Sequence, residues 1–517
     1  MISILGKFKS DGTIHTYPRW AHNPKFEDIK LLLEPVIGLE VHVQLLTRTK
    51  MFCACVSDSS GGEPNTRVCP VCLGLPGVLP VVNKRAVQFT VMTGLALNST
   101  IASDTKFDRK NYPYPDLMKG YQISQFDIPI ASGGWLELDS GNRLGITRVH
   151  MEEDTARLIH RVDDATGKGF SLVDVNRSGI PLMEIVGDPD ISSADDAREY
   201  LTKLRSIVQY LGVSTGNMEE GSFRCDANIS LKIDGQMSDQ RVEVKNMNSF
   251  RAVHGALEYE IQRQTEVLEK GQRIVQETRG WIEDQGITVS QRSKEEAHDY
   301  RYFPEPDLPP LVVDPIWVED IRSKLPELPE NRRKRFQEEY DLSEYDANQL
   351  VATKASADFF EDSLSTRGDK QSIESAIAKS TANWINTDLA HLLNDAGVNI
   401  ENSPISPASL SEMLAFIEDG TISSKMAKDL FEEMFHTEKG AKVIIEAKGL
   451  NQISDDDALA EFVSGVIAEN SKAVDDYRNG KETAVKFLVG QVMRVTRGQA
   501  NPQKATEAVL SQLDRDV

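Results

Sequence analysis

The stretch VIGLEVHVQL, residues 36–45, decides the fold of the first part of the chain. Apolar and polar residues alternate along it, which predicts a β-strand, because successive side chains of a strand point to opposite faces. Glu40, His42 and Gln44 then share one face. A carboxylate beside an imidazole on one rigid surface suits a metal site or an acid–base pair. The plain alternative is an exposed sheet face on which both side chains are solvated.

Segments of the same kind follow this strand. RLGITRVHM (143–151) and RVEVKN (241–246) alternate in a similar way and are bounded by Gly, Asn and Pro residues. Helices are predicted from about 193 to 210, where a pair of serines can cap the first turn, and from about 250 to 268. We therefore expect a mixed α/β domain.

The pattern changes in the C-terminal part of the chain. The proline-rich segment YFPEPDLPPL (302–311) disfavours helix and marks the late edge of the first domain. From Pro326 onward the strand pattern disappears, and Leu, Ala, Phe and Ile recur at helical spacing. We expect an N-terminal extension of unassigned role at 1–34, a mixed α/β domain at 35–325, a helical domain at 326–405 and a helical tail domain at 406–517.

Composition limits the classes of partner. The chain of 517 residues has a net charge of -22, so any nucleic acid must be bound by a local basic patch. We expect no targeting peptide, and no apolar run in this sequence reaches the ~20 residues that cross a bilayer. We expect a cytoplasmic protein with no membrane contact.

Four of the five cysteines lie in one window, MFCACVSDSSGGEPNTRVCPVCLGLPG (51–77). Cys53 and Cys55 form a C-x-C, and Cys69 and Cys72 form a C-x-x-C, with a loop rich in Gly and Pro between them. Four thiolates at this spacing predict a tetrahedral structural Zn²⁺ site. The alternatives are four buried or free thiols, or a redox C-x-x-C, although no thioredoxin-like pattern surrounds it.

Other segments suit phosphate chemistry. RVHMEEDTAR (148–157) and VNRSGIPLMEIVGDPD (175–190) carry carboxylates of the kind that bind Mg²⁺. FDRKNYPYPDLMKGYQISQ (107–125) and EEGSFRCDANISL (219–231) combine cations, rings and hydroxyls suited to nucleotide contacts. Solvated charged faces and hydrogen-bonded turns are the alternatives. No P-loop and no G-x-G-x-x-G follows a strand, so any ATP site here would be of another kind.

Together these motifs, with EVKNMNSF, RSKEEAHDYRYFPEPDLPPL, GTISSKMAK and GQANPQ, resemble the GatB family, the B subunits of the aspartyl/glutamyl-tRNA(Asn/Gln) amidotransferase. The resemblance extends from about Val36 to Gln503. It implies an α+β fold: a cradle-like mixed-sheet kinase/amidotransferase domain, an all-α helical domain and a small all-α tail domain that binds tRNA.

The resemblance also implies a reaction and its partners. ATP phosphorylates the side-chain carboxylate of Glu-tRNA(Gln) and/or Asp-tRNA(Asn), and ammonia then displaces phosphate to give Gln-tRNA(Gln) or Asn-tRNA(Asn). In the implied heterotrimer, the A subunit is a glutaminase that supplies the ammonia through a channel. The small C subunit holds the other two together.

The site residues follow from the resemblance and the motifs together. The Mg²⁺ and phosphoryl-transfer cluster falls on Glu40, His42, Glu153 and Glu184. Because an imidazole is softer than Mg²⁺ prefers, Mn²⁺ or a water-bridged histidine is the alternative. The candidate nucleotide or acyl-acceptor contacts are Arg109, Lys110, Tyr112, Tyr114, Ser222 and Arg224. The candidate ammonia path, with an ion-pair network as its alternative, is Glu295, Glu296, His298, Asp299 and Arg301. The candidate tRNA contacts are Lys425, Lys428, Lys486, Arg494 and Arg497, with Lys504 nearby.

Two rival classes stay open at this point. An RNA-binding scaffold with a structural zinc would not turn over ATP, and a metal-dependent nucleotide hydrolase would do so without tRNA.

Overall fold

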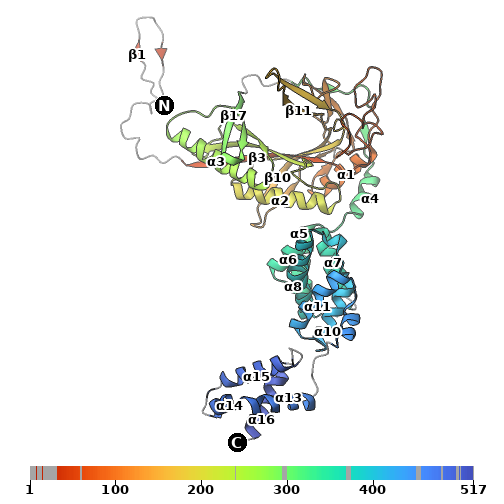
Figure 1. Ribbon diagram of the computed structural model, residues 1–517. Helices are drawn as coiled ribbons and strands as arrows, with labels where there is room; N and C mark the ends of the chain where they lie inside the picture. The colour runs from red at the N-terminus through yellow and green to blue at the C-terminus, as the bar shows by residue number, and fades with distance from the viewer. Residues whose placement is uncertain are drawn as a thin grey trace. The chain divides into compact units, whose positions relative to one another are not determined.

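The computed structural model describes residues 32–517 except 59–60, 239, 294–299, 368–373, 450–455, 479–480, 482, 497–499, 501 and 516–517. It also describes two short paired strands, β1 (Lys7–Phe8) and β2 (Ile14–His15). Apart from these strands and residues 32–34, the extension predicted at 1–34 lies outside the described residues. The chain divides into two compact units, residues 1–325 and 326–517 (Figure 1).

The first unit is built on one large, mainly antiparallel sheet, in which β15 and β16 pair in parallel. Its strands, in spatial order, are β17 (Ile287–Ser293), β16 (Glu277–Ile282), β15 (Val242–Met247), β14 (Phe223–Ile233), β3 (Leu33–Gln44), β13 (Pro181–Gly187), β10 (Arg143–Glu153), β7 (Tyr121–Ser124), β6 (Asp108–Asn111) and β18 (Phe303–Pro304). Leu39, Val41 and Val43 on β3 are completely buried, so the predicted alternation of this strand is confirmed.

Short strands complete the edges of this unit. β8 (Ala131–Ser132) and β9 (Trp135–Glu137) pair with β10, and β4 (Thr100–Ile101) pairs with β8. β5 (Asp104–Thr105) pairs with β19 (Leu311–Val312). β11 (Arg157–Val162) and β12 (Gly169–Asp174) form a separate hairpin.

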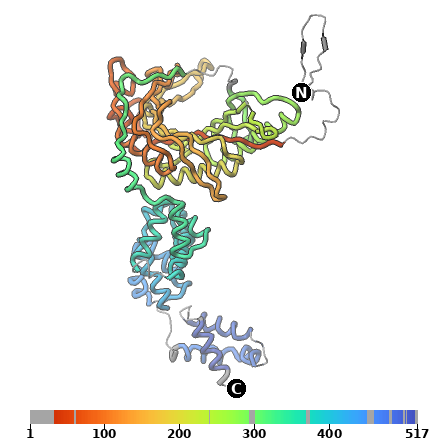
Figure 2. The backbone as a smooth tube through the Cα atoms, turned by 180° about the vertical axis from the view of Figure 1, so that it is seen from behind, coloured from red at the N-terminus to blue at the C-terminus, as the bar shows by residue number. Residues whose placement is uncertain are grey.

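Helices pack against the sheet. The helices of this unit are α1 (Lys84–Ala96), α2 (Ala194–Tyr210), α3 (Phe250–Glu269), the 3₁₀ turn η3 (Glu283–Gln285) and α4 (Pro315–Ser323). α2 and α3 contact each other, and α3 contacts β14 and β15; Figure 2 shows this layering from behind. Both helices begin where the sequence predicts. At each start a serine, Ser193 or Ser249, accepts a hydrogen bond from a backbone N–H group in the first turn and so caps the helix.

The second unit is helical, as predicted. Its first helices are α5 (Pro329–Tyr340), α6 (Glu344–Leu350), α7 (Lys354–Ser365), α8 (Ser375–Trp384), the π-helical turn η5 (Ile385–Leu389), α9 (Ala390–Ala396), the 3₁₀ turn η6 (Ile400–Asn402), α10 (Pro407–Glu418), α11 (Ser424–Thr437) and α12 (Ala441–Lys448). One hydrophobic core extends from Phe336 to Ile445 and includes both Leu393 and Leu410. The boundary expected at residue 405 therefore falls inside this core.

A second helical core follows. It is formed by α13 (Asp456–Glu469), α14 (Ser471–Arg478), α15 (Thr483–Val495) and α16 (Pro502–Arg515), and its buried residues extend from Leu459 to Leu513. Within the described residues, none of the helices is both long and apolar enough to span a bilayer.

Candidate catalytic pocket and thiolate cluster

The pocket lies on one face of the sheet, where four adjacent strands bring polar side chains into one row. Cross-strand pairing places His150 of β10 opposite Glu184 of β13, Glu184 opposite His42 of β3, and His42 opposite Arg224 of β14. Residues directly opposite each other on neighbouring strands point to the same face. These side chains line a cavity of about 570 Å³.

The tightest group in this pocket contains His42, Glu152 and Glu184. One ligand atom from each of these residues lies within 4.8 Å of the others. The His42 Nε2 is 3.4 Å from Glu184 Oε2 and 3.6 Å from Glu152 Oε1, and the His150 Nε2 is 3.3 Å from Glu184 Oε2. Two carboxylates and an imidazole at these distances fit one divalent cation, with Mn²⁺ accepting the imidazole more readily than Mg²⁺.

The electrostatics of this group follow from burial and close pairing. Burial alone would raise the pKa of Glu184, but the charges and hydrogen bonds of His150 and His42 hold it well below its usual range. Burial likewise opposes the charged form of His42, yet the Glu184 and Glu152 carboxylates raise its pKa. The close pairing with the two histidines therefore favours the ionised form of Glu184.

Glu40 lines the same pocket, further along β3. Its Oε1 accepts a hydrogen bond of 2.9 Å from the Asn228 side chain. Burial, followed by the Glu184 and Asp226 carboxylates, raises the pKa of Glu40. The residue lies outside the group of His42, Glu152 and Glu184.

Cations and rings occupy another part of the pocket. The Lys110 ammonium lies 5.0 Å from the centre of the Tyr300 ring, and Tyr112 packs edge-on against Tyr300 with centroids 5.7 Å apart. Burial opposes the charge on Lys110, but the carboxylates of Glu152 and Glu184, together with Tyr302, raise its pKa. This part of the pocket suits an anionic ligand that carries a flat ring.

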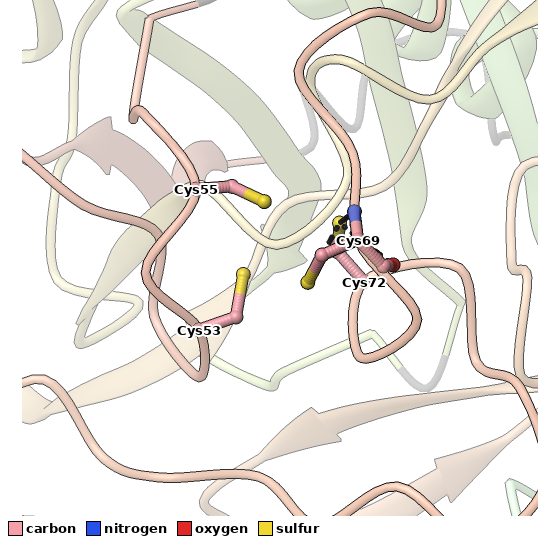
Figure 3. A group of neighbouring side chains, drawn as sticks. All are labelled: Cys53, Cys55, Cys69 and Cys72. Atoms are coloured by element: carbon pink, nitrogen blue, oxygen red, sulfur yellow. Dashed lines mark hydrogen bonds between the residues drawn. The ribbon is translucent and has the colours of Figure 1, made fainter.

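The four cysteines gather at a second site in the same unit (Figure 3). The sulfur atoms of the four residues all lie within 4.8 Å of one another; the residues are Cys53, Cys55, Cys69 and Cys72. A tetrahedral Zn–S₄ centre needs sulfur atoms about 3.8 Å apart, because Zn–S bonds are about 2.3 Å long. The predicted cysteines are thus arranged as such a centre requires.

The cluster also stabilises a thiolate. The hydrogen bond from Cys53 and the Lys50 ammonium lower the pKa of Cys72 to about 5, against the effect of burial. The Cys69 backbone N–H donates to Cys72 Sγ at 3.2 Å. Burial raises the pKa of Cys55 to about 11.

Comparison with known proteins decides the family. The GatB/GatE catalytic domain matches residues 35–319, and the GatB domain matches residues 359–513. This chain belongs to the GatB family. It is 54% identical over 484 residues to the B subunit of the aspartyl/glutamyl-tRNA(Asn/Gln) amidotransferase of Carboxydothermus hydrogenoformans, covering 93% of this chain and 98% of that protein. The corresponding protein of Dehalococcoides mccartyi is 53% identical over 487 residues, covering 93% and 99%.

GatB membership confirms the resemblance seen in the motifs and the predicted fold class, a mixed-sheet catalytic domain followed by an all-helical region. Within the GatB catalytic domain, however, Glu153 does not join the pocket. It follows Glu152 on β10 and therefore points to the opposite face. There it forms an ion pair with Lys119 and accepts a hydrogen bond of 3.0 Å from the Ile123 N–H. The geometry favours Glu152 as the ligand in its place.

Three of the six candidate nucleotide contacts also lie elsewhere. Lys110, Tyr112 and Arg224 line the pocket. Arg109 precedes Lys110 on β6, so its side chain points to the opposite face of the strand. There its guanidinium donates two hydrogen bonds of 2.7 Å to the Glu305 carboxylate. Tyr114 is exposed, and Ser222 belongs to a turn, where it hydrogen-bonds with Thr215 and with the backbone of Asn217.

Sequence reasoning missed other residues of this GatB pocket: His150, Arg148, Asp226, Glu243, Tyr300 and Tyr302. The signal for His150 was available, because it lies in the predicted strand RLGITRVHM, two positions before Glu152, and would share its face if the strand continued. No local signal indicates the tyrosines, which reach the pocket from a segment distant in sequence.

The remaining candidates are placed only in part. Glu295, Glu296, His298 and Asp299 lie outside the described residues, and Arg301 accepts a hydrogen bond of 2.8 Å from Asn111 through its carbonyl. Arg497 likewise lies outside them.

The candidate tRNA contacts that the structure describes are on helices of the second unit. Lys425 and Lys428 lie in the first turns of α11, and Lys428 pairs with Asp388 at 2.9 Å. Lys486 and Arg494 are exposed on α15.

Proposed function

We propose that this GatB-family chain is the B subunit of a tRNA-dependent amidotransferase. It activates the side-chain carboxylate of Glu-tRNA(Gln) and/or Asp-tRNA(Asn) with ATP and converts it to the amide. The observation that carries the proposal is the pocket on the GatB catalytic sheet, which sets the group of His42, Glu152 and Glu184 beside the ring and cation of Tyr300 and Lys110.

The chemistry explains why such a pocket needs both parts. A free carboxylate does not react with ammonia in water, so its oxygen first attacks the γ-phosphorus of ATP and ADP leaves. Ammonia then forms a bond to the acyl carbon, and the C–O bond to phosphate breaks. We assign His42, Glu152 and Glu184 to Mg²⁺ or Mn²⁺, with Glu40 close by. When bound, the cation neutralises charge on the phosphates.

The other pocket residues then have separate tasks. Lys110 and Arg224 contribute positive charge toward phosphate oxygens, and the Tyr112 and Tyr300 rings contact a base or ribose. Arg224 is held in place by Asp154, whose oxygen lies 3.2 Å from it. The protein mainly positions the two reactants and excludes water.

The partners of the proposed reaction follow from its second substrate. The relatives are named as B subunits, which indicates a complex of several different chains. We propose a heterotrimer in which a glutaminase, the A subunit, supplies ammonia and a small C subunit completes the assembly. The complex acts in the cytoplasm on misacylated tRNA.

Phosphate release tests this proposal against its rivals. The assembled complex, supplied with glutamine, should release phosphate from ATP at a rate that rises strongly when misacylated tRNA is added, and amidated tRNA should form in equal amount. A scaffold would release none with or without tRNA. A nucleotide hydrolase would release phosphate at the same rate without tRNA, and either result contradicts the proposal.

We also propose that the four cysteines hold one structural zinc ion. We expect about one zinc per chain in protein purified without chelator, measured by elemental analysis. Cys69→Ser should lower the zinc content and the melting temperature of the catalytic unit, because metal-binding free energy contributes to folding. A zinc-free wild-type protein would contradict this assignment.

A further inference from the structure

Lys50 is a buried cation that the proposed reaction does not use. Its side chain is 1% exposed, which is rare for a lysine. The Nζ lies 3.7 Å from Cys72 Sγ and 3.4 Å from the Val175 carbonyl oxygen. Among the described residues, the partners of its ammonium are a sulfur atom and a carbonyl oxygen, and neither is a carboxylate. Glu153, the nearby acid in the same small cavity, is paired with Lys119 instead.

Gly179 lies beside the Lys50 side chain, and both line the same small cavity as Cys72. Gly179 has a φ of +82°, and a Cβ added there would lie 3.6 Å from Lys50 Cδ and 3.7 Å from Cys72 Cβ. Met51, the next residue, donates its N–H to the Gly179 carbonyl at 2.7 Å. The lysine stem therefore occupies a defined path toward the sulfur atom.

A buried ammonium is costly unless an anion and hydrogen-bond acceptors surround it. The group that supplies negative charge here is the thiolate cluster. Four thiolates around Zn²⁺ carry a net charge of −2, because each contributes −1 and the ion +2, so a neighbouring ammonium offsets half of that charge.

We propose that Lys50 is the outer partner of the zinc centre, donating an N–H···S hydrogen bond to Cys72 and a second hydrogen bond to the Val175 carbonyl. The inference rests on the zinc site of the proposed function. Partners of this kind orient metal ligands and tune their donor strength. Lys50 is thus a positioning residue that connects the metal centre to the loop between β12 and β13.

This connection has a consequence for the pocket. The loop that begins at Val175 leads into β13 at Pro181, and β13 carries Glu184. The Val175 carbonyl that Lys50 contacts therefore lies in the loop that leads to Glu184, a candidate metal ligand of the pocket.

The test compares Lys50→Met with the full-length wild-type protein. Metal release to a coloured chelator should become about tenfold faster or more, the usual effect of losing an outer partner. In protein loaded with Co²⁺, the thiolate-to-metal absorption band should shift to longer wavelength, because a sulfur that loses an N–H donor is a stronger electron donor. Loosened packing alone would not shift this band.

Two further variants keep the result interpretable. Lys106→Met removes another lysine of the same unit, one that pairs with Asp108 and Asp127 at 2.7 and 2.8 Å, and should change neither readout. If Lys50→Met does not fold, Lys50→Gln retains a donor without charge, and its metal release should still be faster than that of the wild type.

The outcomes separate the two proposals. Wild-type release rates and an unshifted cobalt band in the Lys50 variants would overturn the role of Lys50 while leaving the zinc site intact. A wild-type chain that binds neither Zn²⁺ nor Co²⁺ at the cysteines would overturn both, although ATP-dependent amide formation would still stand.

Discussion

Replacing Glu152 with glutamine is expected to slow ATP-dependent amide formation by about two to three orders of magnitude. The substitution keeps the shape of the side chain and removes one of the two carboxylates in the group with His42 and Glu184. Cation affinity should fall with the lost charge, so the variant should need more Mg²⁺ for half-maximal rate. The affinity for misacylated tRNA should hardly change. Single-turnover rates over a Mg²⁺ series, with tRNA binding measured in parallel, check the prediction.

Glu153→Gln is the matched control, because it makes the same chemical change one residue further along β10. Its carboxylate faces Lys119 and the Ile123 N–H rather than the pocket. We expect this variant to lose stability, since a half-buried ion pair loses one partner, and to retain most of the amidation rate in the fraction that is folded. A wild-type rate in Glu152→Gln, with a normal Mg²⁺ requirement, would show that Glu152 is no ligand.

The fold could be predicted from sequence wherever local patterns decide it. The alternation along VIGLEVHVQL and the serine caps of α2 and α3 act within a few residues. The order of the strands could not be predicted, because it depends on contacts distant in sequence, such as Glu184 opposite His42. The division of the helices also depends on packing, since Leu393 and Leu410 share one core across a segment rich in Ser, Pro and Asn.

The sequence was sufficient to predict which motifs form the candidate site, but not always which residue within a motif faces the pocket. Glu152 and Glu153 are chemically identical neighbours, and only the register of β10 against β13 decides which one faces the pocket. Arg109 and Lys110 are likewise neighbouring cations on β6, and only Lys110 lines the pocket. The four cysteines could be predicted without strand register, because their C-x-C and C-x-x-C spacing is itself typical of a metal site.

Deletion of residues 450–517 is expected to weaken tRNA binding by at least about tenfold and to flatten its salt dependence. This cut removes α13 to α16 with their own core, and with it the exposed Lys486 and Arg494. It leaves the core from Phe336 to Ile445 complete, and α12 still ends at Gly449 in a left-handed conformation that suits glycine. For each phosphate that the shortened chain no longer binds, the slope of log affinity against log salt should become shallower by roughly 0.7 to 0.9.

A longer deletion from residue 410 serves as the contrast. It removes Leu410, Leu430 and Phe431 from the first helical core, so that part of the protein should unfold, and a loss of tRNA binding would then say nothing about the tail. The shorter deletion is informative because the metal pocket and both remaining cores should keep their melting behaviour. The double variant Lys486→Gln/Arg494→Gln in the full chain should reproduce part of the loss. If the complex assembled from the 450–517 deletion bound misacylated tRNA as tightly as the wild type and with the same salt slope, the tail would have no part in RNA binding.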